Sequence, residues 1–248
     1  MNMKKFAILS VFALIAVPCL TTLAHANCPE QNCLWYGGDL DLNDPNQNGL
    51  ANENDAIVSG NPYGAATYQS FVIPKGQTWD IESVFTNNLI SFTPTSGYYE
   101  IRSGMSEGNG GTLLLSGMVT GQDLSFNPTG RSDFGYTEYE VDAHFKSVDF
   151  GPGTYWYAMV PICTTCNGRS FNSNANTHLN SVGIQEDGDS FFNSGFFGAN
   201  YTNANNEGVF NNFSGGIDGT IVPEPSSLIM LGSGLLAAAG VVRRRLSR

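Results

Sequence analysis

Thr137-Glu-Tyr-Glu-Val-Asp-Ala-His-Phe-Lys146 alternates apolar and polar side chains over ten consecutive residues. A two-residue period puts the apolar side chains on one face, namely Tyr139, Val141, Ala143 and Phe145. It puts the remaining side chains on the other face, namely Glu138, Glu140, Asp142, His144 and Lys146. This alternation predicts a half-buried β-strand whose charged face is solvated. Two carboxylates on one face could also serve a glycosidase, but an unbroken polar stripe is more typical of a solvated face.

Shorter strand-like segments broken by Gly, Pro and Asn lie on both sides of this strand, and no helical period of useful length occurs between residues 27 and 221. We therefore expect an all-β protein with a single antiparallel β-sandwich, jelly-roll-like, over residues 68–200. Residues 27–67 form an Asn/Asp/Gly-rich N-terminal segment, and residues 201–221 are expected to be an Asn/Gly-rich linker.

The first 26 residues have the pattern of a secretory signal peptide. Lys4 and Lys5 precede an apolar stretch from Phe6 to Leu20, and Ala24-His25-Ala26 provides a small-residue cleavage site. We expect signal peptidase to cut between Ala26 and Asn27, so that the protein is exported.

The last 27 residues have three parts in order: Val222-Pro223-Glu224-Pro225, an apolar run from Leu228 to Val242, and a basic end with Arg243, Arg244 and Arg245. The prolines end any preceding regular structure because they cannot donate a backbone hydrogen bond. The apolar run predicts a single transmembrane helix, and the arginines orient its C-terminus to the cytoplasm. Its 15 residues are fewer than the usual span of about 20, which favours transient anchoring in the inner membrane.

These three parts, together with a signal peptide, resemble the PEP-CTERM sorting signal of Gram-negative bacterial proteins. The resemblance covers residues 222–248 only. It implies recognition and processing near Pro223-Glu224-Pro225 by an exosortase, a membrane protease, and release to the cell surface or extracellular matrix. It also implies a setting of exopolysaccharide production, so extracellular polysaccharide is an expected partner of the class. The body is similar to a recurring secreted sandwich domain of such proteins in Gly151-Pro-Gly-Thr-Tyr-Trp156 and Ser190-Phe-Phe-Asn193, which adds to the fold expectation alone.

The charge of the body argues against nucleic acids and anionic lipid surfaces as partners. The chain has 11 Lys or Arg against 22 Asp or Glu, and six of its cations lie in the two terminal segments. Residues 27–221 therefore carry five cations against 21 acids, a net charge near −16. Such a body repels nucleic acids and anionic lipid surfaces.

Four cysteines remain after signal cleavage: Cys28, Cys33, Cys163 and Cys166. An even count in an exported chain predicts two disulfides, with three possible connectivities. A zinc site and a redox C-x-x-C motif are alternatives. The redox alternative is disfavoured because Pro161 before Cys163 and Asn167-Gly168 after Cys166 predict a loop, whereas a reactive cysteine would sit at a helix N-terminus.

A stretch of the N-terminal segment has the spacing of a calcium-binding loop. Oxygen-bearing side chains occur at loop positions 1, 3, 5, 9 and 12, with a glycine at position 6, and these are Asp44, Asn46, Asn48, Asn52 and Asp55. A turn region that satisfies its own backbone is the alternative. Calcium is the one cofactor that the sequence suggests.

No catalytic motif is present in the sequence, and its mature part has only two histidines, His144 and His178. We therefore expect a non-enzymatic surface or matrix protein. The alternative is a carbohydrate-binding module associated with exopolysaccharide and possibly dependent on calcium, for which Trp35, Tyr36 and Tyr98 are the candidate exposed aromatic residues.

Overall fold

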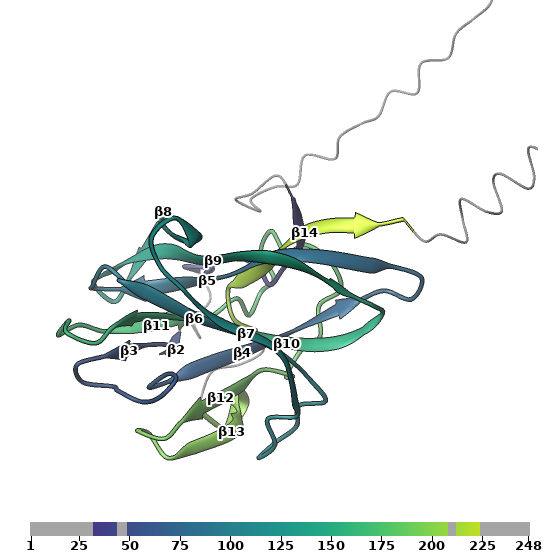
Figure 1. Cartoon of the computed structure of the whole chain (residues 1–248). Helices are drawn as coiled ribbons and strands as arrows, with labels where there is room; N and C mark the ends of the chain where they lie inside the picture. Colours follow the sequence, from purple (N-terminus) through teal and green to yellow (C-terminus); the bar gives the residue numbers. More distant parts are fainter. Residues whose placement is uncertain (1–31, 44–48, 208–211, 224–248) are drawn as a thin grey trace, which may run out of the picture.

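The computed structural model describes residues 32–43, 49–207 and 212–223 (Figure 1). The strands are β1 (Cys33–Tyr36), β2 (Gly49–Ala51), β3 (Asn54–Asp55), β4 (Ala66–Ile73), β5 (Thr78–Ile90), β6 (Ser96–Ser103), β7 (Thr112–Val119), β8 (Leu124–Asp133), β9 (Tyr136–Phe150), β10 (Gly153–Cys163), β11 (Ser170–Ser173), β12 (Phe191–Ser194), β13 (Ala199–Asn203) and β14 (Gly215–Val222). Two short 3-10 helices accompany them, η1 (Gly121–Asp123) and η2 (Ala204–Glu207).

The first sheet is built around β5. This strand pairs with β9 along one edge, and along the other edge it pairs first with β14 and then with β11. The sheet is completed by β8 beside β9, by β1 beside β14 and by β2 beside β11. All of these pairings are antiparallel.

The second sheet has the order β13-β12-β4-β10-β6-β7, with antiparallel neighbours. The short strand β3 adds one parallel pairing at the end of β10. Among the described strands the chain changes sheet eight times: between β2 and β3, β4 and β5, β5 and β6, β7 and β8, β9 and β10, β10 and β11, β11 and β12, and β13 and β14. The predicted all-β class with antiparallel sheets is confirmed.

The main core lies between the two sheets. Ile81 and Val141 of the first sheet and Phe71 and Met159 of the second belong to one buried apolar cluster. Trp35 of β1 joins this cluster and meets Tyr157 edge-on, with 6.1 Å between ring centroids. Each such side chain stabilises the fold by about 1.5–3 kcal/mol through burial, so the paired faces of the sheets hold the sandwich together.

The predicted linker over residues 201–221 is wrong. Its last part is β14, which lies between β1 and β5 as an interior strand of the first sheet (Figure 1). Glycine is required there for close packing, because a Cβ at Gly215 would lie 2.6 Å from Tyr157 Oη and one at Gly216 would lie 2.5 Å from Phe85 Cζ. A glycine-rich composition therefore reflects tight packing in this segment.

The N-terminal segment 27–67 is also part of the sandwich, since it contributes β1, β2, β3 and the start of β4. The expectation that Trp35, Tyr36 and Tyr98 are exposed is wrong, because all three are buried. They lie in β1 and β6, where neighbouring parts of the structure pack against their large aromatic rings. Phe191 and Phe192 are buried, whereas Phe196 and Phe197 are exposed.

The charged face of β9 is solvated only at its far end, where Lys146 is exposed, which corrects the first expectation for the three carboxylates. Glu138, Glu140 and Asp142 are 0%, 4% and 1% exposed. The alternation itself is confirmed, with Val141 and Ala143 in the core. The polar face is enclosed because segments outside the sheet contribute side chains to it, which an isolated strand pattern does not reveal.

Within the described residues, no helix is long and apolar enough to cross a membrane. The signal peptide, with its cleavage site at Ala26 and Asn27, and the apolar run with Arg243, Arg244 and Arg245 lie outside them.

A buried ion pair links the N-terminal strands to β11. Glu53 is fully buried; its Oε1 accepts a hydrogen bond from Arg169 Nε at 2.8 Å, and its Oε2 accepts one from the backbone N–H of Ser170 at 2.5 Å. Burial is the largest influence and raises the pKa of Glu53 to about 7, although the bonds to Ser170 and Arg169 act in the opposite direction.

We predict that the free energy of unfolding decreases as the pH rises from about 5 to about 7. Folded Glu53 keeps its proton to a higher pH than unfolded glutamate, so the folded state binds more protons in this window, and up to about 3 kcal/mol is lost across it. Urea unfolding at several pH values should show this component in the wild type and not in Glu53→Gln. The control is Glu82→Gln, at an exposed position of β5; equal pH slopes in all three proteins would refute the prediction.

Candidate functional site

Three polar side chains form a row across the outer face of the first sheet. The register pairs Glu140 of β9 with Asn127 of β8 on one side and with Asn87 of β5 on the other. Directly paired residues of neighbouring strands point to the same face. The row therefore presents an amide, a carboxylate and a second amide side by side.

An ion-pair network lies beside this row. Arg131 of β8 donates from Nη1 to Asp39 Oδ1 at 2.7 Å and from Nε to Glu138 Oε2 at 2.5 Å. Thr129 Oγ1 donates to the same Glu138 oxygen at 2.6 Å, and the second oxygen of Asp39 accepts from Asn180 Nδ2 at 2.7 Å. Burial alone would lower the pKa of Arg131, but the charge of Glu138 and its other neighbours raise it. The guanidinium is therefore a permanent cation that holds two carboxylates in place.

Tyr36 connects the network to the row. Its hydroxyl donates to Asp39 Oδ1 at 2.5 Å and accepts a hydrogen bond from Asn87 Nδ2 at 3.1 Å. Asn87 Nδ2 also donates to Ser214 Oγ at 2.8 Å. Burial, followed by the charge of Asp39, raises the pKa of Tyr36, so the phenol stays neutral and acts as a donor.

The row and the network enclose a cavity of about 300 Å³. Its lining residues come from β1, β5, β8, β9 and the segment after β1, and they are Tyr36, Asp39, Asn87, Asn127, Pro128, Thr129, Arg131 and Glu140. This volume is at the lower end of the range for small-molecule sites, about 300–1,000 Å³. The cavity is thus large enough for a ligand of a few ring atoms and their substituents.

Asn87 supplies a buried acceptor of the lining. Asn87 is 1% exposed, and its Oδ1 has no hydrogen-bond partner among the described residues. A buried polar atom without a partner costs about 1–3 kcal/mol, and a bound molecule that donates to it recovers this energy. The cavity is therefore suited to binding a donor-bearing ligand.

A second cluster on the same face has the residue types of a catalytic triad without its geometry. His144 Nε2 lies 3.2 Å from Ser125 Oγ and 3.0 Å from Asp142 Oδ2. In a triad the serine and the acid contact different ring nitrogens, so that the histidine can take a proton while the acid orients it. Here both contacts use one nitrogen, and this cluster does not have that arrangement.

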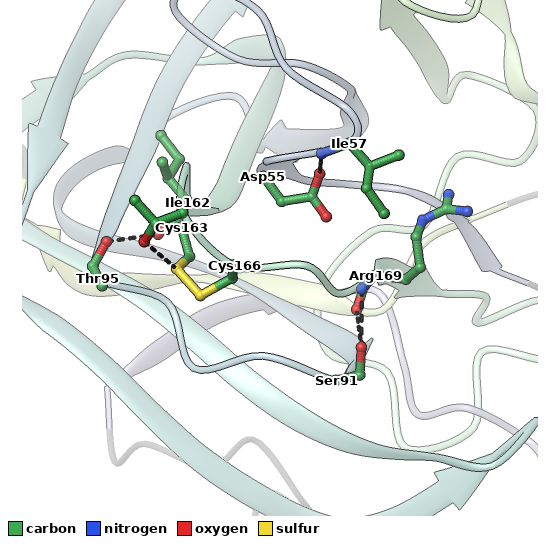
Figure 2. Close-up of a disulfide and its surroundings, with 9 residues drawn as sticks. Asp55, Ile57, Ser91, Thr95, Ile162, Cys163, Cys166 and Arg169 are labelled. Atoms are coloured by element: carbon green, nitrogen blue, oxygen red, sulfur yellow. Dashed lines mark hydrogen bonds between the residues drawn. A yellow bond between two sulfur atoms is a disulfide. The ribbon is translucent and has the colours of Figure 1, made fainter.

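The predicted calcium ligands are only partly described. Nδ2 of Asn52 donates to Asn88 Oδ1 at 3.0 Å and to the Met159 carbonyl at 2.8 Å, so this side chain is engaged between the sheets. Oδ1 of Asp55 accepts the backbone N–H of Ile57 at 2.7 Å (Figure 2). Asp44, Asn46 and Asn48 lie outside the described residues, and the calcium loop stays a prediction. Among the described residues, no group of three or more His, Cys, Asp or Glu is placed to hold a metal ion.

The cysteines form disulfides where the structure describes them. Cys163 and Cys166 are joined to each other in the turn after β10, next to the Asp55 segment (Figure 2). Cys33 is also disulfide-bonded, and Cys28 lies outside the described residues. The C-x-x-C motif lies in a turn, as expected, and its oxidised sulfurs are not zinc ligands.

The sequence alone did not single out Asp39, Asn87, Asn127 or Arg131. The only signal was compositional, since asparagine is disfavoured inside strands and Arg131 is one of only five cations in the body. Glu140 was noticed through the alternation of β9. Its neighbours become visible only when the register of three strands is known.

We predict that Arg131→Met lowers the free energy of unfolding by about 3–5 kcal/mol, because it leaves Asp39 and Glu138 buried without their cation. Chemical unfolding of the wild type and the variant at pH 7 measures this loss. Lys75→Met, at an exposed turn position after β4, is the control, and an equal unfolding midpoint for the two variants would contradict the prediction.

Comparison with known proteins identifies one segment. Residues 222–245 match the family described as the PEP-CTERM protein-sorting motif. No curated protein and no solved structure is significantly similar to the chain. The match falls on the Pro-Glu-Pro, apolar and arginine segment that the sequence singled out, and it confirms the resemblance. The chain therefore carries a PEP-CTERM protein-sorting signal, the mark of an exported protein handled by an exosortase.

Proposed function

We propose that the protein is a non-enzymatic component of the cell surface or extracellular matrix, displayed as a folded β-sandwich. One observation carries the proposal: the sorting signal begins where the sandwich ends. Val222 is the last residue of β14, where it pairs with Thr78, and it is also the first residue of the PEP-CTERM match. A cut near Pro223-Glu224-Pro225 would release the body without removing a strand.

The proposed route has two processing steps. Signal peptidase cuts between Ala26 and Asn27, and the apolar run with its arginines then holds the chain transiently in the inner membrane with the C-terminus in the cytoplasm. An exosortase completes the release at the Pro-Glu-Pro segment. The acidic body, with five cations against 21 acids, favours solubility after release and disfavours nucleic acid as a partner.

Deletion of residues 223–248 tests the sorting step. We expect the truncated protein to be folded and free in the culture medium, because β14 is complete and only the sorting signal is lost. Immunoblots of medium, surface and membrane fractions measure this outcome. Deletion from Gly215 onward is the matched control and should yield unfolded, degraded protein, since it removes the partner of both β1 and β5. Undiminished surface retention of the first truncation would refute the proposed route.

Carbohydrate binding is the second candidate function, and the polar cavity is the observation that favours it. Sugar hydroxyls both donate and accept hydrogen bonds, and the row Asn127, Glu140 and Asn87 offers amide donors together with carboxylate and amide acceptors. The candidate aromatic residues Trp35, Tyr36 and Tyr98 are buried, so an exposed aromatic platform built from them does not support this function. The cavity takes their place as the candidate site.

A glycan array with the purified full-length protein tests this second function. We expect binding to survive a calcium chelator and to weaken by about tenfold in Asn127→Ala, which removes one exposed amide from the cavity and about 1.4 kcal/mol of binding free energy. Gln122→Ala, at an exposed position of η1 outside the cavity, should bind as the wild type does. Loss of binding with chelator alone would move the site to the predicted calcium loop, and absence of binding to any glycan would exclude the function.

A further inference from the structure

We infer that the polar cavity on the outer face of the first sheet selects a hydroxyl-rich ligand that carries a protonated amine, such as an amino sugar, and rejects an acidic sugar. This inference rests on the proposed carbohydrate binding and specifies the charge of the sugar. It is carried by the balance of charges at the cavity and by Asn87 Oδ1, a buried acceptor without a partner among the described residues.

The cavity has more negative than positive charge. Asp39 and Glu140 line it, and Glu138 is bound to the one lining cation, Arg131. These four residues sum to a formal charge of −2. Arg131 is already shared by two carboxylates, and of the other four cations of the body, Arg102 pairs with Glu100 and Arg169 pairs with Glu53.

Charge interactions are strong at this place because the carboxylates are almost fully buried. Asp39, Glu138 and Glu140 are each 4% exposed or less. Charges that are shielded from water interact more strongly than charges on the surface. A second anion entering the cavity therefore meets repulsion from the site and from the strongly acidic body.

The buried acceptor Asn87 Oδ1 requires a donor. Asn87 Oδ1 is an acceptor without a partner among the described residues, and its amide nitrogen is already used by Tyr36 and Ser214. A protonated amine offers three donors and no acceptor, whereas a carboxylate offers acceptors only. An amine thus satisfies the charge and the hydrogen bond together.

Hydroxyl groups of the ligand can form hydrogen bonds with other residues of the lining. Asn127 is exposed at the mouth of the cavity and can both donate to and accept from a hydroxyl. Its partner across the strands is Glu140, so vicinal hydroxyls can bridge an amide and a carboxylate. A ring with several hydroxyls and one amine is the smallest common ligand class that fits this pattern within about 300 Å³.

Titration calorimetry of the purified full-length protein with glucosamine, glucose and glucuronate tests the inference, because these sugars share a ring and differ in charge. We expect glucosamine to bind about tenfold tighter than glucose, and glucuronate not to bind. In Glu140→Gln the preference for glucosamine over glucose should disappear while glucose still binds. Glu82→Gln, on an exposed position of β5, should keep the preference.

Five results would overturn the inference. Equal binding of the three sugars, or tightest binding of glucuronate, would reject the charge selection while leaving carbohydrate binding intact. An undiminished preference for glucosamine in Glu140→Gln would show that the charge selection does not arise in this cavity. Absence of binding by all three sugars and by every glycan on the array would reject carbohydrate binding as well. Circular dichroism checks folding, and if Glu140→Gln does not fold, Asn127→Ala must weaken glucosamine and glucose equally, since unchanged binding would place the ligand elsewhere.

Discussion

The fold depends on how a body with very few cations buries its carboxylates. Each of the three arginines between residues 27 and 221 is bound to a fully buried glutamate: Arg102 to Glu100, Arg131 to Glu138 and Arg169 to Glu53. Burying a carboxylate alone is expensive, and a close guanidinium with good geometry offsets that cost. The three pairs lie in different places, within β6, between β8 and β9, and between the N-terminal strands and β11. They tie distant parts of the sandwich together.

The surroundings of these glutamates differ. Glu100 also accepts hydrogen bonds from the hydroxyls of Tyr68 and Tyr98, so both of its oxygens have donors. At Glu138 only one oxygen has a partner among the described residues, and the arginine is shared with Asp39. The first arrangement is closed and serves packing. The second lies beside a cavity and leaves excess negative charge there, which is why the proposed ligand of opposite charge is assigned to the Arg131 network and not to the Glu100 cluster.

The sequence predicted the fold class because strand alternation depends only on the local chain. The period of β9 and its apolar face were visible in ten residues, and the motif at residues 222–245 was visible in its composition. Burial of Glu138 and Glu140 was not predictable in this way, since it depends on side chains such as Asp39 and Asn180 that are distant in sequence. The same holds for β14, whose glycines are typical of a linker until Phe85 and Tyr157 are placed next to them. The site was missed because register, which aligns Asn127, Glu140 and Asn87, is a property of paired strands.

The position of β14 has a consequence for export. This strand joins β1, from the start of the body, to β5, and it is the last strand before the sorting signal. Pairings between such distant segments form late, because closing the long loop between them costs conformational entropy before the stabilising contacts can form. On the proposed export route, the first sheet would be completed only after Val222 has been translocated, while the signal that follows is still in the membrane. The proposed short apolar anchor would keep the chain next to the membrane until β14 is in place, and the proposed cut beyond Val222 would then release a finished sandwich.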